Sequence, residues 1–394
     1  MLSLDDALAE LLAALQPLSG SEQLPTSRAL GRVLAQDVVS VCDVPPADNS
    51  AMDGYALRAQ DASQPLPVTQ RIPAGAVGQP LAAGEAARIF TGAQVPPGAD
   101  AVVMQEQTEL IDGQLHVRAP VAPGQHIRRQ GEDVRTGSTV LPAGTRLDAI
   151  ALGLAATAGA AQVTVSRRPR VALFSTGDEL VMPGEPLPPG AIYNSNRFLL
   201  RGLLEQLGCE VQDLGIVPDQ LDATRAALRD AAAKADLILT SGGVSVGEED
   251  HLRPAVQAEG ELTLWALAIK PGKPFAFGRV GSSWYMGLPG NPVSSLVTFL
   301  LLVRPALLKL QGATRLQPLS VTLPAGFDWP RSDVRREFIR VRVGADGRLE
   351  RFGNQSSGVL SSAVWADGLA DLAPSTPFTA GTPVRFIPFS GLLA

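Results

Sequence analysis

The chain has 394 residues, which predicts two to four domains rather than a single core. Its 39 acidic and 33 basic residues give a net charge of -6, which argues against nucleic acid as the main partner. The two cysteines and three histidines lack the spacing of metal ligands, which argues against a disulfide framework and a Cys/His zinc site.

The first segment, "MLSLDDALAELLAAL", predicts an amphipathic helix that is capped by Ser3 and buries a face of leucines. It lacks the basic region of a signal peptide, so we expect a soluble, cytoplasmic protein without membrane contact. A second helix is expected after Thr26, with Leu30, Val33 and Leu34 on its apolar face. Residues 1–43 and 128–165 are expected to form one elongated mixed helical domain, with a helix near residues 148–158.

Residues 44–127 are rich in glycine and proline and predict a small β domain. The stretch "TELIDGQLHV" in it predicts a hairpin that turns at Asp112 and Gly113.

Residues 166–312 alternate between short apolar runs and amphipathic segments. This alternation predicts an α/β domain with a doubly wound, mostly parallel sheet and a last helix from Pro292 to Leu310. Residues 313–394 predict a small antiparallel, β-barrel-like domain. In its strand "EFIRVRV", Ile339, Val341 and Val343 are expected to face the core, with Arg340 and Arg342 on the other side. The predicted fold class is therefore multidomain, α/β plus β.

Five polar loops follow the predicted strands of the α/β domain. They read "STGDE" (175–179), "PDQ" (218–220), "SGGVSVGEED" (241–250), "KPGKP" (270–274) and "LPGNP" (288–292). Because ligands of open parallel sheets bind at the carboxyl ends of the strands, these loops predict one binding site.

The residue types in these loops indicate the ligand. Glycines allow close approach of backbone N–H groups, and Lys270 and Lys273 add positive charge, which suits phosphate or another oxyanion. The carboxylates are hard donors that suit Mg²⁺ shared with ligand phosphates; they are Asp178, Glu179, Asp219 and Asp250. Simpler roles remain open, since Asp219 and Asp250 also suit helix caps and "LPGNP" suits an ordinary turn.

The loop at Ser245 also fits the G-x-S-x-G pattern of serine hydrolases. A triad on that fold needs a distant histidine after the serine, yet His251 is the last histidine of the chain and lies six residues on. The pattern therefore indicates a binding loop rather than a nucleophile.

The order of motifs along the whole chain resembles the molybdopterin molybdenumtransferase family, the molybdenum insertases related to the E domain of gephyrin. The resemblance rests on "PPADNSAMDGYAL" (45–57), "IFTGAQVPPGADAVVMQE" (89–106), "RRQGEDVRTG" (128–137), "STGDELV" (175–181), "IYNSNRFLL" (192–200), "LGIVPD" (214–219), "LTSGGVSVGEEDHLR" (239–253), "IKPGKPFAFG" (269–278) and "GLPGNPVSS" (287–295). The segment "GEEDHLR" departs from the family by its acidity and by Arg253 where a lysine is common.

The resemblance implies insertion of molybdenum from molybdate into adenylylated molybdopterin, with Mg²⁺-dependent release of AMP. It implies a four-domain homodimer whose site lies between the α/β domain of one subunit and the β domain of the other, with contacts to molybdopterin adenylyltransferase and molybdoenzymes. Catalytic roles are expected for Asp53, Thr91 and Glu179, and metal contacts for Asp178, Glu179 and Asp250. The motifs and the loop chemistry together give the expected substrate-binding set: Asp133, Asp178, Asp219, Ser241, Gly242, Gly243, Ser245, Asp250, Lys270, Lys273, Pro289 and Pro292.

Two alternatives share the α/β domain. A molybdopterin adenylyltransferase would not need residues 1–165 or the C-terminal β domain. A non-catalytic molybdopterin-binding scaffold would bind the pterin without turnover.

Overall fold

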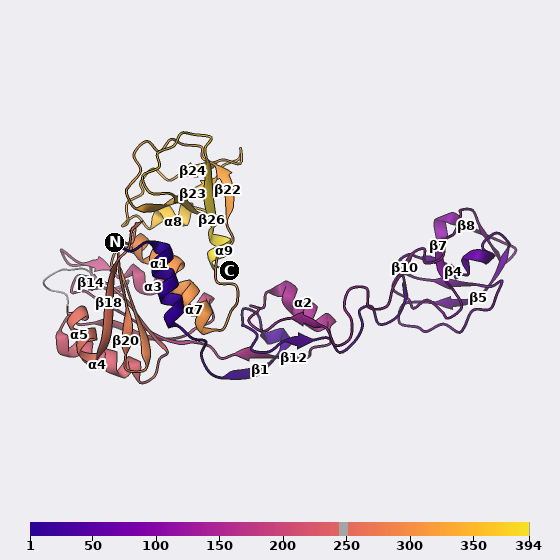
Figure 1. Ribbon diagram of the computed structural model, residues 1–394, viewed down its shortest axis with the longest axis horizontal. Coiled ribbons are helices and arrows are strands. Elements are labelled where there is room, and N and C mark those ends of the chain that lie inside the picture. Colours follow the sequence, from indigo (N-terminus) through magenta and orange to yellow (C-terminus); the bar gives the residue numbers. More distant parts are fainter. Residues whose placement is uncertain (244–250, 394) are drawn as a thin grey trace.

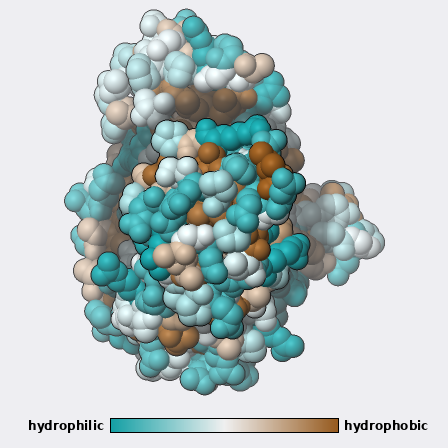
Figure 2. Space-filling view, turned by 90° about the vertical axis from the view of Figure 1, so that its right-hand side faces the viewer, coloured by the Kyte–Doolittle hydropathy of each residue, from teal (hydrophilic) through white to brown (hydrophobic). Residues whose placement is uncertain are grey.

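The computed structural model describes residues 1–243 and 251–393. The molecule is elongated, with a body that holds both termini, a narrow middle part and a β-rich tip at the far end (Figure 1). Seen from the tip end, the surface is mainly hydrophilic, with smaller apolar patches among the polar side chains (Figure 2).

The tip is a six-stranded sheet in the order β7-β4-β6-β5-β9-β8. Its strands are β4 (Gly54–Leu57), β5 (Leu66–Ile72), β6 (Ala86–Ile89), β7 (Ala101–Met104), β8 (Thr108–Ile111) and β9 (Gln114–Val117). The predicted hairpin is confirmed, because Asp112 and Gly113 join β8 to β9 with φ values of 50° and 77°, as a two-residue turn requires.

Three short strand pairs and one helix make up the middle part and its junction with the tip. They are β1 (Ser21–Pro25) with β12 (Gln162–Ser166), β2 (Val38–Val39) with β11 (Thr139–Leu141), β3 (Asn49–Ser50) with β10 (Ile127–Arg128), and α2 (Ala149–Thr157). The helix predicted after Thr26 is wrong. Only a single 3-10 turn forms there, and Gly31 then turns the chain with φ 76°, so that Val33 and Leu34 form bridges to other segments.

The α/β sheet of the body has the order β16-β13-β17-β21-β20-β18. Its strands are β13 (Arg170–Thr176), β16 (Glu210–Val217), β17 (Leu237–Ser241), β18 (Gly260–Ala266), β20 (Pro274–Val280) and β21 (Ser283–Leu288). Within this sheet β20 runs against its neighbours, so the mostly parallel prediction holds. Side chains alternate along the strands: Leu173 and Leu239 join one core, and Phe174 and Ile238 join the core on the other face.

Helices cover both faces of this sheet, as the doubly wound prediction requires. One core includes residues of α3 (Ser195–Gln206), the helix from Pro292 to Leu310 and α1 (Leu4–Ala14); the other includes residues of α4 (Leu221–Ala232) and α5 (Leu252–Glu259). The N-terminal helix is confirmed, since Ser3 caps it through the N–H of Asp6. Its placement in the elongated domain is wrong, because its leucines pack into the α/β core.

The helix predicted from Pro292 to Leu310 is confirmed, with α6 (Pro292–Thr298) and α7 (Arg304–Leu310) joined by a π-helical turn, Phe299–Val303. It is the one helix of the described chain that is long and apolar enough to cross a membrane, but 89% of that window is buried. The helix is therefore a core element, as in a soluble protein.

The C-terminal sheet has the order β19-β23-β25-β26-β22, with β24 beside β23. Its strands are β19 (Ile269–Lys270), β22 (Val321–Pro324), β23 (Arg336–Val343), β24 (Leu349–Arg351), β25 (Gly368–Leu372) and β26 (Pro383–Pro388). A bridge from Ala325 to Leu349 links the two sides of this sheet. The prediction for β23 is wrong at two residues: Arg340 is 0% exposed because it bonds to Ser362 and Ser356, and Val343 at the strand end is exposed.

Candidate active site

A pocket of about 330 Å³ lies at the carboxyl ends of the parallel strands. Its walls come from the loops after β13, β17 and β21 and from the first residues of α3 and α6. Three of the five polar loops thus converge as the sequence predicts. Among the described residues that line the pocket, Glu179 alone carries a charge.

Two glycines shape this pocket wall, and the N–H of Gly242 donates to the Leu288 carbonyl oxygen at 3.1 Å. Gly242 and Gly243 have φ values of 92° and 64°, a region that side chains rarely adopt. A Cβ atom on Gly242 would lie 2.8 Å from the Thr176 carbonyl oxygen, and one on Gly243 would lie 2.9 Å from the Cβ of Leu252. Strand β17 can therefore turn close against β13 only with glycine at these positions.

A buried amide ties three segments of the pocket together. Asn196 on α3 donates from Nδ2 to the Ser241 Oγ at 2.6 Å and to the Gly290 carbonyl oxygen at 2.7 Å. Pro289 supports the same corner, because its carbonyl oxygen accepts the hydroxyl of Ser295. These bonds within the chain hold the three loops in one arrangement.

Some buried polar atoms around the pocket have no hydrogen-bond partner among the described residues. They are the Oγ of Ser175, the Nδ2 of Asn194 and the Oδ1 of Asn196, and the two asparagines are 2% and 7% exposed. Asn194 already caps α3 through its other side-chain atom, which accepts from the N–H of Arg197. An N–H donor beside a helix N-terminus suits an oxyanion, because the helix dipole and the free donor both favour negative charge.

The predicted site residues of the α/β domain have different outcomes. Glu179, Ser241, Gly242 and Pro292 line the pocket, and Gly243 and Pro289 support its wall. Asp178 is exposed beside Glu179, Asp219 follows β16 at the same edge of the sheet, and Lys273 is exposed just before β20. Ser245 and Asp250 lie outside the described residues.

Lys270 is bound to the C-terminal sheet instead of lining this pocket. Its Nζ lies 3.1 Å from Glu337 and 3.4 Å from Asp333, and β19 pairs with β23 beside it. Arg335 also bonds to Asp333, and these contacts hold the pKa of the Asp333 carboxyl well below its usual value. Lys270 thus joins two domains, whether or not it also reaches a ligand.

The tip carries Asp53 and Thr91 as a hydrogen-bonded pair. The Oδ1 of Asp53 accepts the backbone N–H of Thr91 at 2.8 Å and its hydroxyl at 2.7 Å. These bonds, together with the charge of Arg88, lower the pKa of the exposed Asp53 carboxyl. Arg88 is itself held in place, since it donates to the Gly54 carbonyl oxygen at 2.8 Å and lies over the rings of Tyr55 and Phe90.

A single chain does not bring this pair to the pocket. The pair lies next to β4 and β6 in the tip, at the opposite end of the molecule from β14 (Leu180–Val181), which borders the pocket (Figure 1). Asp133 is separate again: it lies between β10 and β11 and lines a shallow hollow in the middle part.

Comparison with known proteins settles the family. Successive parts of the chain match the MoeA N-terminal region (domain I and II) over residues 2–159, a probable molybdopterin binding domain over residues 172–309 and the MoeA C-terminal region (domain IV) over residues 322–389. Molybdopterin molybdenumtransferase of Haemophilus influenzae is 41% identical over 404 residues, which cover 100% of both chains. The chain belongs to the molybdopterin molybdenumtransferase family.

Further relatives agree with this assignment to the molybdopterin molybdenumtransferases, which are transferases of molybdenum cofactor biosynthesis. The member from Nostoc sp. is 40% identical over 87% of this chain and 83% of its own. The crystal structure of the molybdopterin biosynthesis moeA protein from Pyrococcus horikoshii OT3 has a TM-score of 0.84 at 32% identity and covers 98% of this chain and 100% of that chain. The sequence resemblance and the multidomain α/β plus β prediction are confirmed.

The Mg²⁺ that the family resemblance implies can be tested against the side chains present. The described residues contain no group of three or more Asp, Glu, His or Cys side chains placed to hold a metal ion. The carboxylates of Asp178 and Glu179 have no hydrogen-bond or ion-pair partner in the described part of the chain, and Glu179 faces the pocket. This donor set fits Mg²⁺, which proteins often hold through one or two carboxylates while the substrate phosphates complete the coordination.

Sequence reasoning missed the two asparagines and Ser175. The motif "IYNSN" contained a readable signal, because asparagine directly before an amphipathic run is a typical helix cap. Ser175 stood within the quoted loop "STGDE", but its burial depends on the packing of β13 between β16 and β17.

Proposed function

We propose that this chain inserts molybdenum from molybdate into adenylylated molybdopterin, with Mg²⁺-dependent release of AMP, and so forms the molybdenum cofactor. The observation that carries this proposal is the strand-end pocket, where glycine backbone, a helix N-terminus and unpartnered amide groups surround one carboxylate. Such a pocket suits a phosphate-bearing substrate with a bound cation. The substrate supplies its own dithiolene sulfurs, so molybdenum needs no Cys or His cluster from the protein.

In this proposal the pocket holds the pyrophosphate of the substrate. The N–H group of Gly243 and the Nδ2 of Asn194 would donate to phosphate oxygens. Asp178 and Glu179 would hold Mg²⁺, which neutralises phosphate charge when bound. Glu179 or Asp53 would then position the pyrophosphate or the oxygen that attacks it, because both are exposed carboxylates.

We infer that the complete site forms between two subunits of a homodimer. The lining of the pocket has one charge, that of Glu179, whereas the tip offers Arg71 and Arg88, which both lie over the ring of Phe90 at 4.6 Å. A pyrophosphate and a molybdate bring several negative charges, which a partner's basic tip would balance. Asp53 and Thr91 would enter the site with that tip.

The inference of a shared site is tested by mixing inactive variants. Glu179→Ala damages the pocket and Asp53→Asn damages the tip, so a mixed dimer contains one intact site. Molybdenum insertion should return when the two variants are unfolded, mixed and refolded together. The matched control mixes Glu179→Ala with Gly242→Ala, which damage the same pocket, and it should stay inactive; equal activity of both mixtures would refute the shared site.

The activity itself is tested by incubating the protein with adenylylated molybdopterin, molybdate and Mg²⁺, while AMP release and metal incorporation are followed together. We expect both products, and loss of both in Glu179→Ala. Pterin binding without AMP release would favour the scaffold, and formation of adenylylated molybdopterin from ATP would favour the adenylyltransferase. We propose that the enzyme works in the cytoplasm, in contact with molybdopterin adenylyltransferase and with the molybdoenzymes that receive the cofactor.

A further inference from the structure

The strand-end pocket has a polar part and an apolar edge. The polar part includes Glu179, Asn194 and Ser241, and the apolar edge includes Ile192 and Tyr193. These two apolar side chains are 55% and 44% exposed, so a ligand that covers them gains the free energy of removing apolar surface from water. The polar part suits phosphate, but the apolar edge calls for a different group of the ligand.

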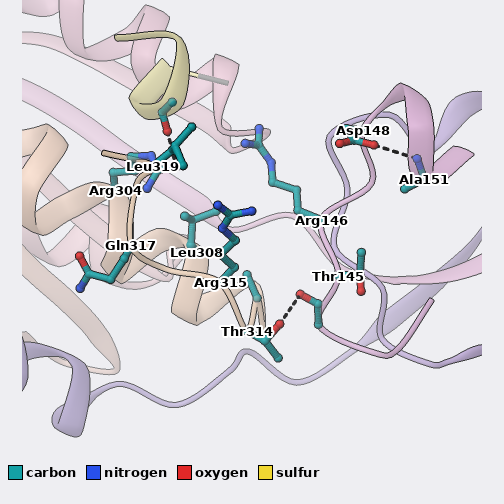
Figure 3. A pocket seen from close by; sticks show the side chains of 13 residues that line it. Thr145, Arg146, Asp148, Ala151, Arg304, Leu308, Thr314, Arg315, Gln317 and Leu319 are labelled. Carbon is teal, nitrogen blue, oxygen red and sulfur yellow. Dashed lines mark hydrogen bonds between the residues drawn. The ribbon is translucent and has the colours of Figure 1, made fainter. Parts of the chain in front are cut away.

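Tyr193 is the one aromatic side chain among the described residues that line this pocket. A larger cavity, of about 550 Å³, lies where the middle part of the chain meets the body, and it has no aromatic side chain in its described lining (Figure 3). An aromatic ring offers a flat face on which another planar ring stacks, which an aliphatic side chain does not. The strand-end pocket is thus better suited than the junction cavity to a ligand with a planar ring.

Strand pairing fixes Tyr193 relative to the groups that are proposed to hold Mg²⁺ and phosphate. Strand β15, which consists of Ile192 and Tyr193, pairs with β14 and places Val181 opposite Tyr193. On either side of this pair, the N–H of Ile192 donates to the Glu179 carbonyl oxygen at 2.7 Å, and the N–H of Asn194 donates to the Val181 carbonyl oxygen at 2.9 Å. The ring, the carboxylate and the amide therefore belong to one hydrogen-bonded unit.

The far end of the Tyr193 side chain is also held. Its hydroxyl donates to the Glu185 carbonyl oxygen at 3.1 Å, in the loop that joins β14 to β15. A side chain that is fixed at its backbone and at its hydroxyl loses little conformational freedom when a ligand binds. Because the hydroxyl is engaged within the chain, the ring is the group that Tyr193 offers to a ligand.

We propose that the ring of Tyr193 stacks against a planar heterocycle of adenylylated molybdopterin. This inference rests on the proposed function, in which the pyrophosphate lies at Asn194, the residue next to Tyr193. The substrate has a planar ring system on each side of its pyrophosphate, the adenine and the pterin. Both have the π face that an aromatic side chain covers, so the two are distinguished by experiment.

The test is calorimetric titration of the full-length protein with AMP, molybdopterin and ribose 5-phosphate. Tyr193→Ala should weaken binding of the ligand whose ring stacks by about 5- to 150-fold. Ribose 5-phosphate has a phosphate but no planar heterocycle, and its binding should not change. Tyr193→Phe keeps the ring and loses the bond to Glu185, and it should bind all three ligands as the wild type does. The matched control, Phe198→Ala, removes an aromatic side chain that is 56% exposed and does not line the pocket, and it should also bind as the wild type does.

The two ring-bearing ligands identify the ring that lies over Tyr193. Loss of AMP affinity in Tyr193→Ala assigns the adenine to this residue, and loss of molybdopterin affinity assigns the pterin. The proposal is overturned if the wild type binds neither ligand or if Tyr193→Ala binds both as tightly as the wild type does. An equal loss for ribose 5-phosphate would also overturn it, because the effect would then come from the shape of the pocket and not from stacking.

Steady-state kinetics separate this inference from the proposed function. With adenylylated molybdopterin, molybdate and Mg²⁺, Tyr193→Ala should raise KM with little change in kcat, because stacking stabilises the bound substrate and the transition state alike. If the wild type inserts molybdenum and the KM of Tyr193→Ala is unchanged, stacking on Tyr193 is overturned and the proposed function stands. If AMP or molybdopterin binds through Tyr193 but no molybdenum is inserted, the stacking site stands and the transferase activity is overturned.

Discussion

Replacing Asn196 by aspartate tests whether one buried amide holds the strand-end pocket together. Its Nδ2 donates to the Ser241 Oγ at 2.6 Å and to the Gly290 carbonyl oxygen at 2.7 Å. Aspartate has the same shape, but its ionised carboxylate has acceptors only. In Asn196→Asp an anionic oxygen would therefore face the Gly290 carbonyl oxygen with no proton between them.

The magnitude follows from these two bonds. Asn196→Ala loses both donors and leaves a buried carbonyl oxygen unsatisfied, which costs about 1–3 kcal/mol in free energy of unfolding. Asn196→Asp adds an uncompensated buried charge, and the total cost at neutral pH is about 3–5 kcal/mol. Aspartate should therefore be worse than alanine, although it is closer to asparagine in shape and volume.

The pH dependence has a defined sign. Burial raises the pKa of a carboxyl group, and the protonated form of the new side chain can donate its proton to the Gly290 carbonyl oxygen. The stability of Asn196→Asp should thus approach that of the wild type in acid and should fall as the pH rises through the raised pKa.

Urea unfolding of the α/β domain, followed by tryptophan fluorescence between pH 5 and pH 8, measures this effect. This range lies about 1 to 4 pH units above the pKa of an ordinary aspartate, where a raised pKa is expected. Asn354→Asp is the matched control, because the Oδ1 of Asn354 is exposed and accepts the N–H of Ser356, a role that a carboxylate keeps. The control should change stability by less than about 0.5 kcal/mol. The reasoning would be refuted if Asn196→Asp were as stable as the wild type at pH 8, or if its loss in free energy of unfolding did not become smaller toward pH 5.

Three further changes test other parts of the molecule. Ellman's reagent at pH 8 should modify Cys209 only after denaturant is added, because burial raises the pKa of this thiol to about 12; rapid modification of Cys209 itself in the native protein, as distinct from the less buried Cys42, would contradict that burial. Asp333→Asn should lower the thermal midpoint above about pH 4, because hydrogen bonds from Arg335 hold the pKa of Asp333 well below its usual value. This difference should decrease as the pH falls from there toward the lowered pKa, and a difference independent of pH would exclude the ion pair as its cause. In urea unfolding, Gly144→Ala should destabilise the protein more than the control Gly347→Ala. Both glycines have positive φ, but only at Gly144 would the new Cβ lie 2.6 Å from a threonine methyl group. Equal effects would show that this close approach is unimportant.

The order of strands and helices in the α/β domain could be predicted from the sequence, because each element follows the local periodicity of apolar residues. The apolar runs at Arg170–Thr176 and Glu210–Val217 became β13 and β16, and the glycine after α3 ended that helix with φ 78°. The position of the pocket followed as well, since parallel strands place the loops after them at one edge. Glu179 and Gly242 could therefore be assigned to one site from the order of strands and loops along the chain.

The local pattern of apolar and polar residues predicted the wrong structure in two places. The apolar residues Leu30, Val33 and Leu34 fit one face of a helix, but Gly31 between them adopts φ 76° and redirects the chain. Arg340 alternates with apolar residues as an outward side chain would, yet it is buried because the loop that holds Ser356 and the helix that holds Ser362 cover that face of β23. In both places the partners lie far away in the sequence: Leu34 forms a bridge to Val165, and Arg340 bonds to Ser356 and Ser362.

Partners that are distant in sequence also explain why only a ligand contact was predicted for Lys270. Its sequence neighbours, proline and glycine after an apolar strand, are typical of a binding loop, and nothing near it in the chain is acidic. Its partners Asp333 and Glu337 come from a different domain, and they meet it only because β19 leaves the α/β sheet and pairs with β23. Glu337 is 2% exposed and also accepts the indole N–H of Trp329, so loss of the lysine would leave a buried carboxylate with less compensation. A loss of activity in a Lys270 variant is therefore evidence for substrate contact only if the pairing of β19 with β23 is intact.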